Sequence, residues 1–377
     1  MNGQTLFVGR GSTRKLQSEL ERLCLKRVMI VAGKRSFILS GAKSSIEKQT
    51  AGFKFQFFHE FSQNPKLEDA ILGAHLFRRF RCDGVVAIGG GSAIDTAKSI
   101  LAFQTNEGRE KQLATGLFKL DESLPPLIAV PTTTGSGSDS TSFAVIYVDG
   151  TKYSLQSPEL LPRVVFLDAN FSDSLPADVV ACTGFDALSQ AVESFWARSA
   201  TEESREYAEK AILEILKHLL AAVNSSDGAS REAMLIAANM AGKAINISKT
   251  TAPHALSYEI SKRTGLSHGH AVAITLGNFF EINRILSQGS GTEGKYARVE
   301  RSLFKLIGVT CPDEARMFWY DLMKRCNLKT ELDGLKGATT VRDLEEIVDS
   351  VNLERLRNHP LSPSRDMLIQ ALIGPQK

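Results

Sequence analysis

The chain twice places a turn rich in glycine, serine and threonine directly after a short apolar run, within residues 85–100 and 127–142. The first run then continues with apolar residues at helical spacing. A buried strand, a glycine turn and a helix N-terminus form an anion site, because glycine lets the backbone approach a ligand and the first helical N–H groups have no partner within the helix. Two such turns predict a pyrophosphate-containing cofactor, most simply a dinucleotide, although one such turn alone is also found in ordinary α/β domains.

Up to residue 174 the sequence alternates between strand-like and helix-like segments, which predicts a parallel sheet with helices on both faces. An antiparallel hairpin is expected around the Asp149-Gly150 turn. Outside the two glycine-turn units, the expected strands are 27–32, 53–58, 143–148, 153–156 and 164–167, and the expected helices are 41–50 and 66–80.

The pattern changes beyond residue 174, where long helical periods follow one another and strand-like runs are absent. The first three expected helices are 177–197, 201–224 and 230–249. A chain of 377 residues is too long for one small core. We therefore expect an α/β dinucleotide-binding domain over residues 1–174, and an all-helical domain for metal and substrate over residues 175–377.

The composition argues against several classes of function. The net charge of +3 is close to balance, which gives no indication of a nucleic-acid or anionic-membrane partner. Five cysteines without a C-x-x-C pair favour a reducing compartment. No apolar run approaches the ~20 residues that span a bilayer, and the N-terminus does not resemble a signal peptide. The sequence predicts a cytoplasmic protein.

In their order along the chain and in their residue sequences, the two turns resemble those of the iron-containing (group III) alcohol dehydrogenases. This family shares a fold with dehydroquinate synthase and glycerol dehydrogenase. The resemblance extends from residue 5 to residue 370. It implies that the first turn holds the pyrophosphate and the second lines the nicotinamide. The family usually has Glu where this chain has Asp139, a conservative change. The implied cofactor-binding residues are Asn64, Gly89, Gly90, Gly91, Ser92, Asp95, Thr132, Thr133, Ser136, Ser138 and Lys152.

A metal site is implied by the same resemblance. In the family, one ion is held by an Asp, a His four residues later, and two His fourteen residues apart. Asp186, His254 and His268 match this spacing, but Gln190 stands in the second position. Fe²⁺ is the first choice of metal, with Zn²⁺ or Mn²⁺ as alternatives, because such nitrogen and oxygen donors suit all three. Without the spacing, these histidines would be read as ordinary polar residues at helix ends.

The expected chemistry is reduction of an aldehyde. Polarisation of the aldehyde oxygen by a divalent ion favours hydride delivery from a nicotinamide. His270 is the candidate general acid, because the ordinary pKa of imidazole lies near the working pH. Many relatives have His four residues after the first metal-binding His, where this chain has Tyr258.

Within this family, four segments are most similar to the phosphonoacetaldehyde reductase (hydroxyethylphosphonate dehydrogenase) branch. This branch implies reduction of phosphonoacetaldehyde to 2-hydroxyethylphosphonate. Because a phosphonate requires cationic or N–H-rich contacts, Lys152 and Lys249 are candidate residues of the catalytic cleft. The alternatives are a general alcohol dehydrogenase for small uncharged substrates and a metal-dependent lyase like dehydroquinate synthase. The segments are 152–155, 186–190, 250–258 and 266–271.

One position after the first expected strand bears on the choice between NADH and NADPH. Many relatives have Asp where this chain has Gly33, and that carboxylate would bind the ribose 2′-OH and repel a 2′-phosphate. Lys34 and Arg35 follow and offer donors to a phosphate. We therefore expect NADPH to be used at least as well as NADH, with the protein as a homodimer.

Overall fold

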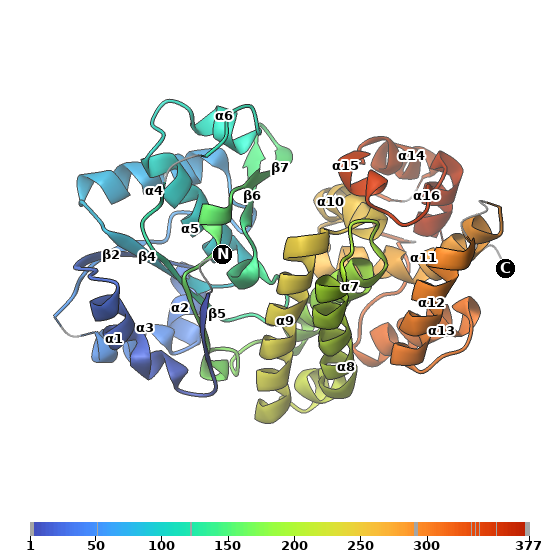
Figure 1. Cartoon of the computed structure of the whole chain (residues 1–377), viewed down its shortest axis with the longest axis horizontal. Helices are drawn as coiled ribbons and strands as arrows, with labels where there is room; N and C mark the ends of the chain where they lie inside the picture. The colour runs from blue at the N-terminus through green and yellow to red at the C-terminus, as the bar shows by residue number, and fades with distance from the viewer. Residues whose placement is uncertain are drawn as a thin grey trace. The chain divides into compact units, whose positions relative to one another are not determined.

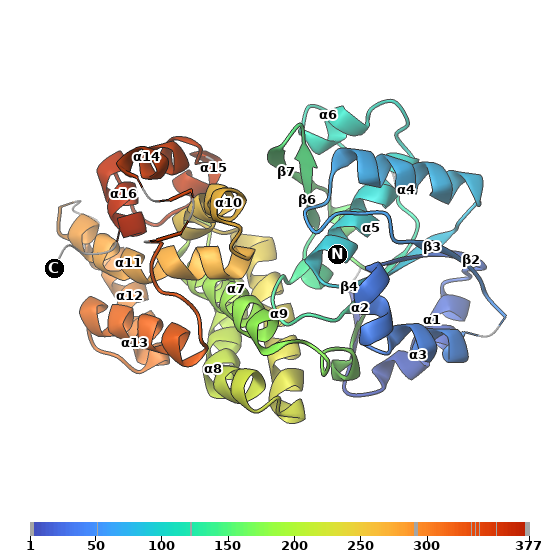
Figure 2. The same ribbon diagram turned by 180° about the vertical axis from the view of Figure 1, so that it is seen from behind.

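The computed structural model describes residues 4–50, 52–120, 123–289, 293–332, 334–335, 337–338, 340–351 and 353–373. Contacts divide the chain into two compact units, Met1–Leu175 and Pro176–Lys377. In Figures 1 and 2 the first unit runs in colour from blue to green, and the second from green to red.

The first unit is built on a parallel sheet with the strand order β1-β8-β5-β4-β2-β3. Its strands are β1 (Thr5–Val8), β2 (Arg27–Ala32), β3 (Lys54–Phe58), β4 (Gly84–Gly89), β5 (Leu127–Pro131) and β8 (Val164–Leu167). From β2 the chain first moves to β3 on one side and then to β4 on the other. The strand order therefore reverses between β2 and β4, and ligands of such sheets bind outside the carboxyl ends of the strands at this point.

Helices cover both faces of this sheet (Figure 1). On one face, Leu16, Phe37 and Ile46 from three successive helices join a core with Ile30 of β2 and Ile88 of β4. The α4–α5 pair covers the other face (Figure 2). The helices are α1 (Leu16–Arg22), α2 (Lys34–Leu39), α3 (Ala42–Gln49), α4 (Leu67–Arg79), α5 (Gly91–Gln104) and α6 (Glu110–Ala114).

A separate hairpin pairs β6 (Phe143–Val148) with β7 (Thr151–Gln156) in antiparallel register. Asp149 and Gly150 form its turn, and both have positive φ, at 50° and 78°. This combination belongs to the type I′ turn that suits the twist of a two-residue hairpin. The expected hairpin is confirmed.

The described part of the second unit is helical. Its helices are α7 (Ala177–Trp196), α8 (Glu202–Asn224), α9 (Gly228–Ser248), α10 (Ala252–Thr264), α11 (His268–Gly289), α12 (Glu293–Ile307), α13 (Pro312–Arg325), α14 (Val341–Asp349), α15 (Leu353–Arg357) and α16 (Arg365–Ile373). The predicted fold class is confirmed. The sequence patterns did not reveal β1, α1, α2 and α6, because elements of four to seven residues are too short to show a period.

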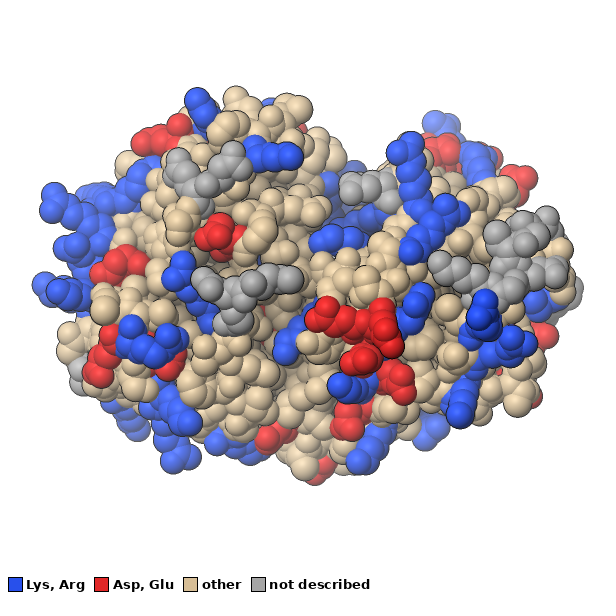
Figure 3. Space-filling model, in the orientation of Figure 1, with Lys and Arg blue, Asp and Glu red and all other residues tan. Residues whose placement is uncertain are grey.

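The surface carries both signs of charge. On the face in Figure 3, acidic and basic side chains occur over both units, in keeping with the net charge of +3. Within the described residues, none of the helices has the length and apolar character that crossing a membrane requires.

Candidate active site

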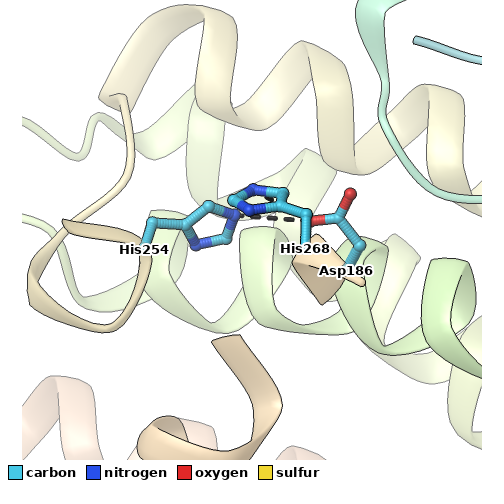
Figure 4. A group of neighbouring side chains, drawn as sticks. All are labelled: Asp186, His254 and His268. Carbon is cyan, nitrogen blue, oxygen red and sulfur yellow. Dashed lines mark ion pairs between the residues drawn. The ribbon is translucent and has the colours of Figure 1, made fainter. Parts of the chain in front are cut away.

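Three side chains from separate helices of the second unit converge on one point (Figure 4). Asp186 comes from the middle of α7, His254 from the first turn of α10, and His268 from the first residue of α11. Their candidate ligand atoms all lie within 4.8 Å of one another. Asp186 Oδ1 is 3.4 Å from His254 Nε2 and 4.0 Å from His268 Nε2. The structure thus brings together three of the four predicted metal ligands.

A glycine allows this convergence. Gly269, the second residue of α11, lies so close to α7 that an added Cβ would meet the carbonyl oxygen of Cys182 at 2.1 Å and Asp186 Cβ at 2.7 Å. A larger residue would force the two helices apart, because backbone cannot rotate out of the way as a side-chain tip can. Gly269 therefore sets the separation between His268 and Asp186.

Each histidine is held through its other ring nitrogen. Glu193, two turns after Asp186 on α7, places Oε2 against His254 Nδ1, while Ser257 Oγ lies 3.3 Å from His268 Nδ1. Such contacts fix the ring orientation and raise the basicity of a metal-binding imidazole. Glu193 was not among the residues predicted from the sequence. The sequence feature that indicates it is a carboxylate seven residues after Asp186, on the same face of an otherwise apolar helix.

Glu193 also organises the start of α10. Its Oε1 accepts hydrogen bonds from Thr251 N at 3.0 Å, from Thr251 Oγ1 at 2.7 Å and from His254 N at 3.3 Å. The side chain is fully buried. A carboxylate is stabilised at a helix N-terminus by these N–H groups and by the helix dipole. Glu193 therefore joins the helix that carries His254 to the helix that carries Asp186.

The chemistry of this cluster fits a divalent cation. Asp186 Oδ1 and His254 Nε2 are buried atoms that have no hydrogen-bond partner within the described residues, and buried polar atoms of this kind are normally satisfied. Burial alone would lower the pKa of His254, but the charges of Glu193 and Asp186 outweigh it and raise that pKa. An environment that favours a protonated imidazole also favours a bound cation.

Gln190 occupies the remaining predicted position. It lies one turn after Asp186 on α7 and is 4% exposed, so both residues face the same side of the helix. An amide offers a carbonyl oxygen, which binds Fe²⁺ or Zn²⁺ less strongly than imidazole does. Its role as a fourth ligand stays a prediction.

The Gln190→His variant is expected to bind Fe²⁺ or Zn²⁺ about tenfold more tightly, because imidazole would replace the amide oxygen. Competition with a chromophoric chelator measures this affinity. Gln190→Leu, of similar size but without a ligand atom, serves as the control and should bind metal no better than the unmodified protein. Unchanged or weaker binding by Gln190→His would place residue 190 away from the fourth ligand position.

The two predicted cofactor turns contact each other in the first unit. A Cβ added to Gly90 would meet Thr133 at 3.1 Å, and one added to Gly91 would meet Ser136 Cβ at 2.8 Å. These contacts leave no room for larger residues. Gly91 opens α5, whose N-cap has no side-chain hydrogen bond. The helix N-terminus is therefore free of a side-chain cap at the switch point of the sheet, as an anion site requires.

The second turn is fixed by a buried lysine that was likewise not predicted from the sequence. Lys98 Nζ of α5 donates to the carbonyl oxygens of Ser138 at 2.6 Å, Thr141 at 2.7 Å and Phe143 at 2.8 Å. Burial lowers the pKa of Lys98 to about 8, despite the opposing charge of Asp95. The signal was a lysine three residues after Asp95 within an apolar helix.

Asp95 supports the second turn from α5, and its expected contact with the pyrophosphate stays a prediction. It is buried, its Oδ2 accepts from Val145 N at 3.0 Å, and it bonds the Ser138 side chain. Burial raises the pKa of Asp95, while the charges of Lys98 and Lys152 act against that shift. Asp95 thus links α5, the second turn and the hairpin that carries Lys152.

The other predicted contacts of the cofactor lie near the same edge. Ser92 Oγ donates to the carbonyl oxygen of Gln63, next to Asn64, which is exposed. Thr132 follows β5 directly, and its N–H donates to Gly89 O at 3.0 Å. Gly33 follows β2 and caps α2, which begins with the exposed Lys34.

The structure gives local contacts for two of the predicted catalytic residues. His270 Nε2 lies 2.7 Å from Lys329 O, and burial lowers the pKa of His270 despite this contact. Since successive helical residues turn by about 100°, a residue two places after His268 faces away from the metal ligands. Lys249 directly follows α9 with φ of 61°, and its Nζ donates to Asn246 O at 3.3 Å. The geometry gives no support to His270 as the acid.

Comparison with known families agrees with this architecture. The family profile described as "Iron-containing alcohol dehydrogenase" matches residues 3–169, and that described as "Fe-containing alcohol dehydrogenase family, C-terminal" matches residues 180–373. The chain therefore belongs to the iron-containing alcohol dehydrogenase family.

Individual relatives differ in how much they share. The 4-hydroxybutyrate dehydrogenase of Cupriavidus necator is 32% identical over 93% of this chain and 91% of its own length. "Probable alcohol dehydrogenase EutG" of Escherichia coli (strain K12) is 36% identical, but the match spans 63% of this chain and only 61% of that relative. The crystal structure of sulfoacetaldehyde reductase from Bifidobacterium kashiwanohense, in complex with NAD+, has a TM-score of 0.87 at 29% identity, covering 97% of this chain and 95% of that one.

Proposed function

We propose that the protein is a metal- and nicotinamide-dependent oxidoreductase that interconverts small aldehydes and primary alcohols. The cluster of Asp186, His254 and His268 carries this proposal, because it offers two nitrogen donors and one carboxylate to a divalent cation in a chain of the iron-containing alcohol dehydrogenase family. Family membership favours this redox reaction over the dehydroquinate synthase-like lyase. When bound, the cation would polarise a carbonyl oxygen and the nicotinamide would supply hydride.

The chain's own residues have three tasks in this reaction. Asp186, His254 and His268 present the ligand atoms, and the side chain of His268 is 37% exposed, so the cluster is open to solvent on that side. Glu193 and Ser257 hold the imidazoles in place. In the first unit, Gly90 and Gly91 let the backbone approach a pyrophosphate at the start of α5.

A panel of unbranched aldehydes, assayed with NADH and NADPH alongside metal analysis of the same sample, tests the proposal. Turnover should be lost on chelation and restored by Fe²⁺, Zn²⁺ or Mn²⁺. Tight dinucleotide binding without turnover of any aldehyde by the metal-loaded protein would contradict it and support a non-catalytic binding role.

A narrower candidate is reduction of phosphonoacetaldehyde. Its support is the similarity over 97% of the chain to a sulfoacetaldehyde reductase, whose substrate carries a sulfonate in the place of the phosphonate. Lys249 directly follows α9 and precedes the segment that leads to His254, which fits a cation near such an anion. The general candidate remains the broader one, because other relatives are dehydrogenases of uncharged alcohols such as methanol.

The Gly33→Asp variant is expected to shift the ratio of kcat/KM values towards NADH by about tenfold, because the new carboxylate would repel a 2′-phosphate and bind the ribose 2′-OH. Gly33 has φ of −66°, so the backbone accepts a side chain. A Cβ there would meet the Ser36 side chain, with Oγ at 2.6 Å and Cβ at 3.9 Å. Gly33→Ala makes the same contact without the charge and is the matched control. Unmodified protein that uses NADH alone would contradict this account of the turn.

A further inference from the structure

The two histidines of the cluster are held in different ways. His254 is buried, and its Nδ1 contacts the carboxylate of Glu193. His268 is the most exposed of the three ligands, and its Nδ1 lies 3.3 Å from Ser257 Oγ. That hydroxyl group donates its one proton to His254 O at 2.8 Å, so it can only accept from His268. A contact of 3.3 Å is longer than a normal hydrogen bond, and a neutral hydroxyl binds an N–H more weakly than a carboxylate does.

An aromatic ring is stacked on the imidazole of His268. It belongs to Tyr258, and the two ring centres lie 5.4 Å apart with planes inclined by 9°. Tyr258 comes one turn after His254 on α10, so both side chains lie on the same face of that helix. The His254 ring meets His268 at a steep angle, with centres 5.3 Å apart and planes inclined by 71°. Two rings one turn apart on α10 therefore contact the first side chain of α11.

The Tyr258 ring is itself fixed by its surroundings. Cζ of Arg355, on α15, lies 5.2 Å from the ring centre, within the range of a cation–π contact. The helix that carries Tyr258 is joined to α7 at its start, because Glu193 accepts hydrogen bonds from Thr251 N and Thr251 Oγ1. A ring held in this way can restrict a neighbouring imidazole, and a restricted ligand loses less conformational freedom when a metal ion binds.

Resting on the function proposed above, we propose that Tyr258 is a positioning residue of the metal site, whose ring keeps His268 Nε2 directed at Asp186 and so determines how tightly the cluster retains a divalent cation. An exposed imidazole has several rotamers open to it, and most of them would carry its ligand atom away from the cluster. Stacking on Tyr258 favours the rotamer that the structure shows. Tyr258 therefore does for His268 what the carboxylate of Glu193 does for His254.

Competition for Zn²⁺ between the full-length protein and a chromophoric chelator tests this proposal. Tyr258→Leu removes the ring and should bind Zn²⁺ roughly tenfold more weakly, as expected for loss of a residue that supports a metal-binding histidine. Tyr258→Phe keeps the ring and should bind Zn²⁺ within about twofold of the unmodified protein. Tyr207→Leu is the matched control and should leave the affinity unchanged. Tyr207 is a half-buried tyrosine of α8 with Lys243 Nζ 5.8 Å from its ring centre, and it contributes no atom to the cluster.

The outcomes separate this proposal from the proposed function. Equal weakening by Tyr258→Phe and Tyr258→Leu would assign the effect to the hydroxyl group, and unchanged Zn²⁺ affinity of Tyr258→Leu would give the ring a packing role only. Either result would overturn the proposal, whether or not the unmodified protein turns over an aldehyde. Weaker Zn²⁺ binding by Tyr258→Leu alone would uphold it, even if no aldehyde is a substrate, an outcome that would contradict only the proposed function.

Proton NMR of the metal-free protein tests the stacking itself and does not depend on the folding of Tyr258→Leu. The ring current of Tyr258 should shift the imidazole protons of His268 upfield. The chain has seven histidines, so the His268 signals can be assigned by their absence from the spectrum of His268→Ala. The upfield shift should persist in Tyr258→Phe. His268 signals at the ordinary position of an exposed histidine would overturn the proposal.

Discussion

The His268→Ala variant should lose bound metal and lower kcat/KM for aldehydes by at least about a thousandfold, since carbonyl polarisation by a divalent ion contributes several kcal/mol to catalysis. The substitution removes one of the three clustered ligand atoms. It should leave the fold intact, because His268 is the first residue of α11 and its side chain is 37% exposed. Metal analysis after dialysis against a chelator measures the loss.

Two further measurements separate metal binding from other effects of this change. Dinucleotide affinity, followed by NADH fluorescence, should persist, because the glycine turns belong to the other unit. His218→Ala is the control: its Nδ1 lies 3.1 Å from Ser230 Oγ, between α8 and α9, and it contributes no atom to the cluster. Full activity of dialysed His268→Ala would exclude the metal site.

The sequence predicted the position of the two glycine turns directly after strands well, because each turn is a local feature. A glycine turn between a strand and a helix is formed by neighbouring residues, so its conformation is encoded within a few positions. That Gly33 and Gly89 lie at the carboxyl ends of adjacent strands follows from the strand order, which a single sequence does not reveal. The contacts of Gly90 and Gly91 with the second turn likewise depend on the pairing of β4 with β5.

At the metal site, the spacing of the ligands in the sequence predicted the residues that converge on the cluster. It did not predict the residues that hold the imidazoles in place. Asp186, His254 and His268 were identified through the family's spacing. Glu193 acts only because α7 packs against the start of α10, a contact between residues far apart in sequence. His270 was chosen for its ordinary pKa, yet the turn of α11 directs it to Lys329 O. Its role as the general acid stays a prediction.

The Glu193→Gln variant should bind metal about 10–100-fold more weakly, the usual cost of losing a partner behind a metal-binding histidine. Gln retains one oxygen for the N–H groups of Thr251 and His254, but it loses the negative charge and the second acceptor that faces His254 Nδ1. The imidazole then becomes a weaker donor whose orientation is less fixed. Competition with a chromophoric chelator gives the affinity, and thermal unfolding gives the stability of the metal-free protein.

Comparison of two variants distinguishes support of the metal from support of the helix. Glu193→Ala removes every acceptor and leaves buried N–H groups unsatisfied, at about 1–3 kcal/mol each, so it should also lower Tm markedly. Glu193→Gln should lower metal affinity with a much smaller change in Tm, while Glu209→Gln, an exposed change of the same charge on α8, should alter neither. If Glu193→Gln lowers Tm and leaves metal affinity unchanged, the carboxylate acts only as a cap for α10. Loss of affinity at nearly constant Tm would show that a buried charge on α7 orients the imidazole of His254.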